Sequence, residues 1–531
     1  MSVLPGRDSV SGSVDGSQSA LYATRFMQLA AVFLLLAVIA WPVVFSFDLW
    51  VLKDRGSLLN LDYLLDEGFH PAVDTYYLYG LLPVLIQRVL FKLFGRGYWP
   101  MLACTVVYWL ATAALWANLS QHLPRARRWW LAILFLAPIL IWINPNFPYC
   151  LVQLSLLSSI LFVLERRADL ALACAAVGCW SVPSLPIAMA GLLGLLIAIE
   201  WLGQPQPNAR DLIRRFAPGA AVYAAIGLLL VAVFGWASVA ATAISTRGAE
   251  FYKAVHFSLL GSGREFLFPP NAGVKFYLTT RAGWWIAANL MLICLSLSSL
   301  CALIRNRNLD RRHVAILLCA SLYYIYVAVA FGPPDQHIIY DPILALGVIM
   351  GLAYAPAPAR MRAGLFGLFV VLSISSIWSS LGYARWLWKT NTRSAVTAGL
   401  YADSAWAAQW SRILDLSTRR GLLFLSYGTG VHHYFPGLSS PDVWFLQEGE
   451  LLPSDTQRVL KQIQQADIVV QDLTGTTQFF EEAGTRAALE PFCVTSSTAF
   501  FRVFERPGSN PVADDRGGMP CSAEAVTSTV H

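Results

Sequence analysis

The carboxylates between residues 48 and 98 are the side chains of this sequence best suited to chemistry. They are Asp48, Asp54, Asp62, Asp66, Glu67 and Asp74. A carboxylate within hydrogen-bond reach of a hydroxyl group can take its proton as a general base, and a second one can orient the hydroxyl or hold a divalent cation. The ordinary alternative is a solvated acidic loop in which Asp62 or Asp66 caps a helix.

A short helix is expected to position these acids. Residues 58–66 are predicted to be helical, and Asp54 and Asp74 lie on either side of them. A turn can therefore bring Asp54 and Asp74 together. Spacing alone does not choose between this arrangement and a solvated loop.

The composition indicates where such a loop would lie. Only 13% of the 531 residues are charged, whereas 56% are hydrophobic. Soluble domains carry about 25% charged residues, so this chain has too little polar surface for a purely soluble enzyme. The balance also excludes a disordered chain, a coiled coil and a disulfide-rich scaffold, and it predicts a multi-pass membrane protein.

Apolar runs of spanning length recur along the chain. A membrane-spanning helix needs about 20 apolar residues, and about eleven runs are candidates. They cover residues 29–47, 101–119, 129–143, 150–164, 168–182, 186–202, 218–236, 283–304, 314–331, 338–354 and 363–383. The runs at 150–164 and 168–182 are the shortest relative to a full span.

Arginine clusters predict the orientation, because basic residues gather in cytoplasmic loops. The clusters are Arg125, Arg127 and Arg128; Arg166 and Arg167; Arg210, Arg214 and Arg215; Arg305, Arg307, Arg311 and Arg312; and Arg360 and Arg362. All fall on one side if residues 76–94 form an interfacial helix. The net charge of +6 then reflects cytoplasmic loops, and no basic stripe with interleaved aromatic residues indicates nucleic-acid binding.

The polar C-terminal region is predicted to be a small extracytoplasmic α/β domain. Strands are expected at residues 421–427, 467–471 and 500–504, and helices at 402–416 and 454–465, the second capped by Ser454 or Asp455. The predicted organisation is a cytoplasmic tail at 1–27, a transmembrane domain at 28–383 that includes the external loop 48–98, the α/β domain at 384–506 and a disordered tail at 507–531.

Most of the nine cysteines lie in apolar runs without metal-ligand spacing and are expected to be small buried hydrophobic residues. Cys493 and Cys521 lie in the C-terminal region, where a disulfide is compatible with their positions but not required by them.

The motifs of residues 54–95 resemble the first external loop of GT-C membrane glycosyltransferases. They run Asp54, Gly68, Pro71-x-x-Asp74, Tyr79-Gly80-Leu81-Leu82-Pro83 and Phe91-x-x-Phe94-Gly95. The pattern is most similar to bacterial enzymes grouped with dolichyl-phosphate-mannose protein mannosyltransferases and lipid A sugar transferases. The resemblance implies a GT-C-like α-helical fold of about eleven transmembrane helices, with juxtamembrane helices in this loop.

The resemblance also implies roles for individual residues. Asp54 matches the first acid of the family, which is the presumed base, and Asp74 matches the acid of its later Pro-x-x-Asp element. Tyr79 matches the Tyr of its Tyr-Gly and would position the acceptor or the loop. Where the family often has Asp-Glu, this chain has Asp54-Arg55, so Asp62 remains a rival base.

A second match begins at Gly332 and runs Gly-Pro-Pro-Asp335-Gln-His337-Ile-Ile-Tyr340. Related enzymes place polar side chains here near the donor phosphate, which implies that Asp335, His337 and Tyr340 contribute to donor binding. His337 and Tyr340 can each donate a hydrogen bond to a phosphoryl oxygen, and both are also typical helix-end anchors at a membrane surface.

Two further segments offer polar side chains. Asn146, in a polar turn at residues 144–149, suits sugar binding or simply joins two helices. Arg264 lies in the long external loop among other basic residues, and it can bind phosphate through charge-assisted hydrogen bonds.

The expected function is sugar transfer from a polyprenyl-phosphate-linked donor to a lipid, glycan or protein acceptor on the extracytoplasmic face of the plasma membrane. The alternative is a multi-pass transporter or a lipid or glycan flippase. Transporters place ionisable residues inside their helices, whereas the acids here gather in one loop. No cofactor is required, and dependence on a divalent metal ion is left open, as are the sugar, the acceptor and the oligomeric state.

Overall fold

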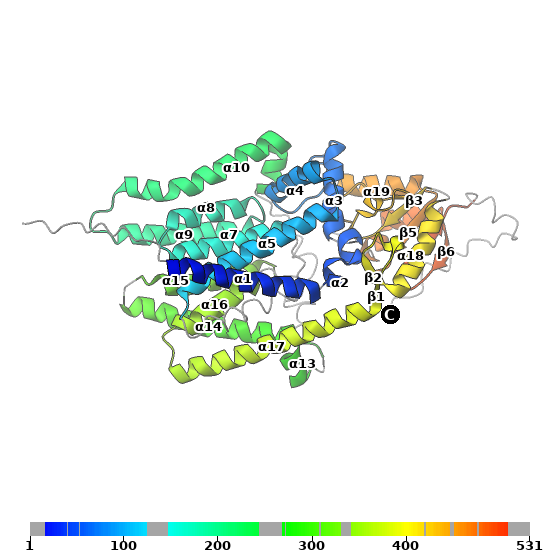
Figure 1. Cartoon of the computed structure of the whole chain (residues 1–531). Helices are drawn as coiled ribbons and strands as arrows, with labels where there is room; N and C mark the ends of the chain where they lie inside the picture. The colour runs from blue at the N-terminus through cyan, green and yellow to red at the C-terminus, as the bar shows by residue number, and fades with distance from the viewer. Residues whose placement is uncertain are drawn as a thin grey trace, which may run out of the picture.

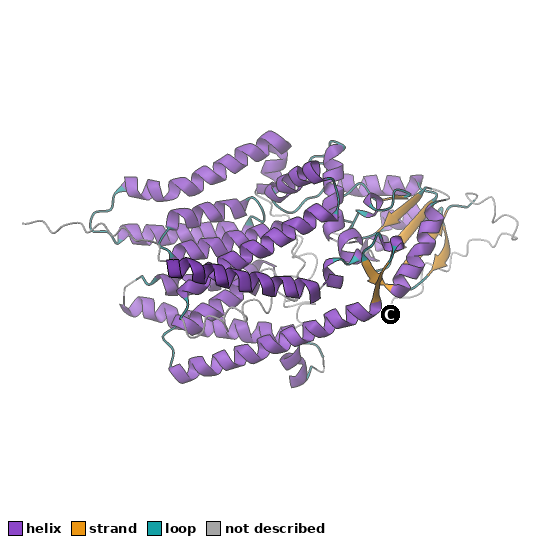
Figure 2. Ribbon diagram, in the orientation of Figure 1, coloured by secondary structure: helices purple, strands orange, loops and turns teal. Residues whose placement is uncertain are grey.

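The computed structural model of the chain describes residues 16–39, 41–52, 54–124, 147–243, 268–270, 272–306, 309–330, 341–418, 421–446, 451–474 and 477–507. A bundle of long helices forms one end of the molecule, and a small α/β domain forms the other (Figure 1). Strands occur only in that second part of the described chain (Figure 2).

The helices of the bundle run along one common direction (Figure 1). They are α1 (Gly16–Ile39), α5 (Tyr98–Leu119), α7 (Phe147–Leu164), α8 (Ala168–Cys179), α9 (Ser184–Leu202), α10 (Ala209–Ala243), α14 (Arg281–Asn306), α15 (Arg311–Ala330), α16 (Asp341–Tyr354) and α17 (Ala359–Thr390). Short helices α2 (Trp41–Val44), η2 (Ser120–His122) and α13 (Val274–Thr279) join them.

The bundle has the surface of a membrane protein. Five of its described helices, α5, α9, α10, α14 and α17, are long and apolar enough to cross a membrane, and three shorter apolar helices accompany them. Large apolar side chains such as Leu34, Leu297 and Trp378 point outward and are 58–77% exposed. Apolar surface of this extent is stable in lipid but not in water. The predicted helical membrane fold is confirmed, while the count of about eleven spans stays a prediction.

Several boundaries differ from the predicted ones. Helix α1 begins at Gly16, inside the predicted tail, and ends at Ile39 rather than at residue 47. Helix α17 continues to Thr390, past the expected domain boundary at residue 384, because the residues between them contain no Pro or Gly to end the helix. The predicted span at 129–143 and most of the predicted tail at 507–531 lie outside the described residues.

Residues 48–98, called the first loop below, lie between the bundle and the α/β domain (Figure 1). The loop contains the π-helix η1 (Asp48–Leu52), α3 (Asp54–Asp66) and α4 (Leu81–Phe94). Helix α3 starts four residues earlier than predicted. Helix α4 has 14 residues, about 21 Å, which is too short to span a membrane and suits the predicted interfacial helix.

Backbone hydrogen bonds fix the end of the first loop to the bundle. Gly80 N donates to Ser181 O at 2.6 Å, and Leu82 N donates to Trp180 O at 3.0 Å. Any side chain at Gly80 would collide with the Trp180 carbonyl, so the close approach explains the glycine of the Tyr-Gly motif.

The C-terminal domain is a mixed five-stranded sheet covered by helices, as predicted. Its strands lie in the order β4-β3-β5-β7-β6, with β3 parallel to β4 and β5, and β7 antiparallel to β5 and β6. Their bounds are β3 (Leu422–Leu425), β4 (Leu438–Ser439), β5 (Ile468–Asp472), β6 (Cys493–Ser497) and β7 (Phe501–Glu505). The three predicted strands are β3, β5 and β7, whereas the exposed edge strand β6 and the two-residue β4 lack a clear hydrophobic signal.

Helices pack on both faces of this sheet. On one side, α18 (Ser404–Ser417) inserts Trp406 and Trp410 against Phe501. On the other, α19 (Pro453–Gln465) and α21 (Ala483–Leu489) cover the buried strands. The remaining elements are β1 (Asn391–Arg393), η5 (Ala395–Thr397), β2 (Tyr401–Asp403), η6 (Val431–His433) and α20 (Thr477–Glu481).

The cysteines follow the sequence expectation. Seven of those described are free, and Cys493 is disulfide-bonded, while Cys521 lies outside the described residues.

Candidate functional site

The first turn of α3 carries the presumed base. Asp54 is the first residue of the helix, directly after the π-helix η1. A carboxylate in the first turn of a helix is stabilised in its ionised form by the helix dipole, and the ionised form is the one that can accept a proton. The orientation of its side chain lies outside what the structure describes.

Arg55, the next residue, is buried and only 2% exposed. Its charge acts on the thiols of Cys104 in α5 and Cys150 in α7, and on the phenol of Tyr434 in the C-terminal domain. The side chain therefore lies where the first loop, the bundle and the C-terminal domain meet.

Asp62 and Asp66, one turn apart on α3, form a cluster with two arginines. Arg96 Nε donates to Asp62 Oδ2 at 2.8 Å, and Arg88 donates to Asp66 Oδ1 at 2.8 Å. Arg88 also pairs with Asp62, and Arg96 with Asp66. Burial opposes ionisation of Asp66, but the hydrogen bonds and charges of Arg96 and Arg88 hold the pKa of its carboxyl below the usual value. The cluster ties α3 to α4.

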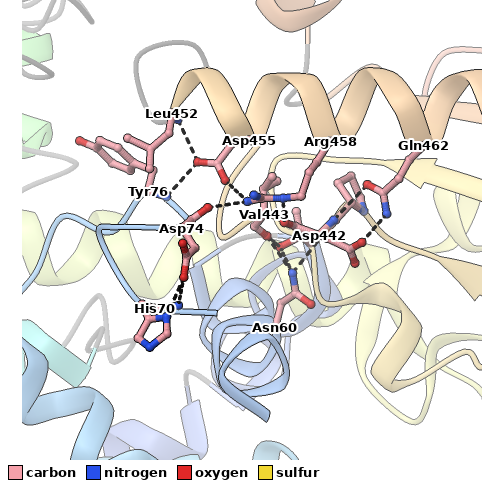
Figure 3. A network of polar contacts seen from close by, with 12 residues as sticks. Asn60, His70, Asp74, Tyr76, Asp442, Val443, Leu452, Asp455, Arg458 and Gln462 are labelled. Atoms are coloured by element: carbon pink, nitrogen blue, oxygen red, sulfur yellow. Dashed lines mark hydrogen bonds and ion pairs between the residues drawn. The ribbon is translucent and has the colours of Figure 1, made fainter. Parts of the chain in front are cut away.

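Asp74, the other predicted carboxylate, lies in a turn apart from this cluster. Its Oδ2 accepts a hydrogen bond from His70 N at 2.8 Å and lies 2.7 Å from His70 Nδ1 (Figure 3). The side chain is 43% exposed. This arrangement stabilises the turn between α3 and α4.

The C-terminal domain docks on α3 through buried Asn60. Its Nδ2 donates to Thr429 Oγ1 and to Val443 O, both at 2.8 Å (Figure 3). Close by, Gly430 packs on the backbone of Gly56, and a Cβ at Gly430 would lie 2.4 Å from Gly56 O. The domain therefore contacts α3 within one turn of Asp54.

A second contact joins α19 to the turn that holds Asp74. Arg458 Nη2 donates to Asp74 O at 2.8 Å and pairs with the buried carboxylate of Asp455 (Figure 3). Asp455 Oδ2 accepts from Tyr76 N at 2.9 Å and from Leu452 N at 2.8 Å. Burial raises the pKa of Asp455, although these hydrogen bonds oppose the rise. Of the two predicted caps of this helix, Asp455 is the one that receives the N-terminal hydrogen bond.

Tyr79 joins the first loop to the bundle. Its hydroxyl donates to Tyr149 Oη at 3.1 Å, and its ring packs edge-on against Trp444 of the C-terminal domain at 5.6 Å between centroids. Tyr79 therefore contacts residues from both other parts of the molecule, which agrees with the positioning role expected of it.

Several predicted site residues are not placed. Asn146, Arg264, Asp335, His337 and Tyr340 lie outside the described residues. Within the ranges that are described, no three His, Cys, Asp or Glu side chains are grouped as ligands for a metal ion.

Sequence reasoning missed the residues that join the two domains. Arg96, Asn60, Thr429, Gly430 and Tyr434 make or surround these contacts, but their partners are distant in sequence. The one available signal was Arg55, a basic residue where the resembling family has an acid.

Comparison with solved structures finds two similar chains. They are ArnT from Cupriavidus metallidurans bound to undecaprenyl phosphate and the same protein in the apo state. The first is 15% identical with a TM-score of 0.45, and the match covers 90% of this chain and 98% of the other. The second is 14% identical with a TM-score of 0.46, covering 89% and 97%. No protein-family model and no curated protein matches. The proposals below rest on this chain's own residues.

Proposed function

We propose that this chain is an integral membrane glycosyltransferase that uses a polyprenyl-phosphate-linked sugar. Asp54 takes the proton of an acceptor hydroxyl, and the hydroxyl oxygen attacks the anomeric carbon. The bond from that carbon to the phosphate oxygen breaks, and the lipid phosphate leaves with the electron pair. The acceptor is a lipid, glycan or protein on the extracytoplasmic face.

The observation that carries the proposal is the position of Asp54. It begins a helix that is held between an apolar helical bundle and a polar α/β domain. A lipid-linked donor reaches such a place from the bilayer and a polar acceptor reaches it from water. A helix fixed on both sides keeps the base in one position, which lowers the entropic cost of reaction.

The other two acids suit different roles. Asp62 accepts hydrogen bonds from two guanidinium groups, and a carboxylate in such a cluster has little tendency to accept a proton. Asp74 stabilises its turn and supports the contact with Arg458. We therefore assign the base to Asp54 and supporting roles to Asp62 and Asp74. His337, Tyr340, Asp335 and Arg264 remain candidates for donor binding, and Asn146 for the acceptor.

A test of the function separates transfer from transport. The purified chain is reconstituted into vesicles that contain a radiolabelled polyprenyl-phosphate sugar, and released polyprenyl phosphate is measured beside the accessibility of intact donor on each leaflet. Glycosyl transfer releases polyprenyl phosphate and labels an acceptor. A flippase would move intact donor between leaflets and release none, and that result would overturn the proposal.

A further inference from the structure

We propose that the Arg55 guanidinium and the Tyr434 hydroxyl together bind the phosphoryl group of the polyprenyl phosphate, at the junction of the bundle and the C-terminal domain. This inference rests on the proposed function, because it names the residues that hold the leaving group of that reaction. Neither residue is among those that the resemblance assigns to donor binding.

The first observation is the location of a permanent positive charge. Arg55 is 2% exposed, and a guanidinium remains charged at any ordinary pH. Its charge acts on Cys104, six residues into α5, and on Cys150, three residues into α7. At 1.5 Å per residue, these thiols lie about 9 Å and about 5 Å along the helices from the ends nearest the first loop. Arg55 therefore faces the bundle, which is the side from which a lipid arrives.

The second observation is a buried hydroxyl from the other domain. Tyr434 directly follows η6, and its hydroxyl oxygen is buried without a hydrogen-bond partner among the described residues. Burial raises the pKa of Tyr434, and Tyr98 adds to the rise while the charge of Arg55 opposes it. The phenol thus keeps its proton and can donate a hydrogen bond.

The chemistry of this pair fits a phosphoryl group. The planar guanidinium presents several N–H donors that match two phosphate oxygens at once, and a phenol can donate to a third. Burying the charge costs free energy, which an anionic ligand offsets. Because α3 carries both Arg55 and Asp54, the same helix would hold the leaving group and the base.

The two residues come from different parts of the chain, and the contact between Gly56 and Gly430 sets their separation. Gly56 follows Arg55, and Gly430 lies four residues before Tyr434. The site is therefore complete only when the C-terminal domain is docked on α3.

The test measures how much the phosphate contributes to lipid binding. The full chain in detergent is titrated with undecaprenyl phosphate and, in parallel, with undecaprenol, which lacks the phosphate. The wild type should prefer the phosphate by at least about ten-fold, because hydrogen bonds to a charged group contribute about 1.5–3 kcal/mol. Arg55→Met should abolish this preference, Arg55→Lys should retain part of it, and Tyr434→Phe should reduce it about five-fold.

Arg412→Met is the matched control, because Arg412 lies exposed on α18, and its preference should equal that of the wild type. Gel filtration shows which variants are folded; if Arg55→Met is not, Arg55→Lys and Tyr434→Phe decide. Full retention of the preference in the folded Arg55 and Tyr434 variants overturns the inference. Equal, Arg55-dependent competition by phosphatidylglycerol also overturns it, because the phosphoryl group would then belong to a phospholipid.

This outcome is distinguishable from failure of the proposed function. A wild-type chain that transfers sugar while both variants keep their phosphate preference contradicts only the assignment of Arg55 and Tyr434. A wild-type chain that binds the phosphate through these residues but transfers no sugar contradicts only the glycosyltransferase proposal.

Discussion

Asp62 shows how pairing changes the chemistry open to a carboxylate. Its side chain is 7% exposed and contacts Arg88 and Arg96, which lie 26 and 34 residues further along the chain. The sequence placed Asp62 in a helix but could not reveal these two partners. Spacing alone therefore left Asp54 and Asp62 as rivals, and the three-dimensional pairing separates them.

Replacing Asp62 should test this separation. Asp62→Asn leaves the two arginines to share the more exposed Asp66, so the free energy of unfolding should fall by about 2–3 kcal/mol. Thermal unfolding in detergent should show a lower Tm, while kcat for the folded fraction stays within a few-fold of the wild type. Asp66→Asn, the half-exposed neighbour, should cost less than about 1 kcal/mol. A loss of kcat at unchanged Tm in Asp62→Asn would instead favour Asp62 as the base.

His432 and His433 predict a dependence of stability on pH. Burial lowers the pKa of His432 to about 4, and the charge of Arg96 adds to this effect. Burial and the charges of His432 and Arg96 lower the pKa of His433 to about 3. Both side chains pack against the Tyr63 ring of α3, with centroids 5.0 and 5.8 Å away.

Between about pH 6.5 and these lowered values, the unfolded chain binds protons that the folded chain does not. The two histidines should therefore lower the free energy of unfolding as the pH falls from 7 to 5, by about 1–2 kcal/mol each. The Tm of the double variant His432→Asn/His433→Asn should drop less over this range than that of the wild type. Buried acids such as Asp442 and Asp455 shift in the opposite sense, so the difference between the two proteins is the quantity to measure. Parallel curves would contradict the assignment.

At the scale of elements, the sequence predicted types better than ends. Helices α3, α18 and α19 and strands β3, β5 and β7 lie where hydrophobic patterns placed them. The helix ends differ by a few residues because tertiary contacts decide them. Helix α3, for example, extends back to Asp54, where Gly430 of the C-terminal domain packs against its first turn.

The contact between η6 and α3 should be sensitive to a single methyl group. Gly430 has φ −93° and ψ 7°, which most residues can adopt, so backbone strain does not explain the glycine. Gly430→Ala would place a Cβ 2.4 Å from Gly56 O and 2.7 Å from Gly56 Cα, where only backbone could move. We expect a Tm several degrees lower and reduced transfer, although Gly430 is not expected to touch substrate.

Gly421→Ala is the matched control, because no atom lies within 4 Å of the added Cβ and the residue is in the same domain. Its Tm and transfer rate should match the wild type. If Gly430→Ala also matched the wild type in both measurements, the C-terminal domain would not position α3.

At the scale of the whole molecule, composition predicted the division into an apolar bundle and a polar domain. It could not reveal how the two parts meet, because Asn60, Arg458 and Tyr79 find partners hundreds or tens of residues away. It also could not place the loops that carry His337 and Arg264. The disulfide at Cys493 favours an oxidising compartment for the C-terminal domain.

The orientation can be tested by labelling single cysteines in intact cells with a membrane-impermeant maleimide. Ser454→Cys, exposed at the start of α19, should react from outside. Arg210→Cys, exposed near the start of α10 in a predicted cytoplasmic cluster, should react only after permeabilisation. The unmodified protein gives the background from the native cysteines. The reverse pattern would contradict the predicted extracytoplasmic C-terminal domain.

The most direct test of the account concerns Asp54. Transfer from a radiolabelled polyprenyl-phosphate sugar is measured for the purified wild type, Asp54→Asn and the control Asp415→Asn, which removes an exposed carboxylate on α18. With Asp54 as the general base, Asp54→Asn should lower kcat by about 100-fold or more at unchanged Tm, and Asp415→Asn should behave as the wild type. An Asp54→Asn protein that transfers sugar at the wild-type rate would contradict the account.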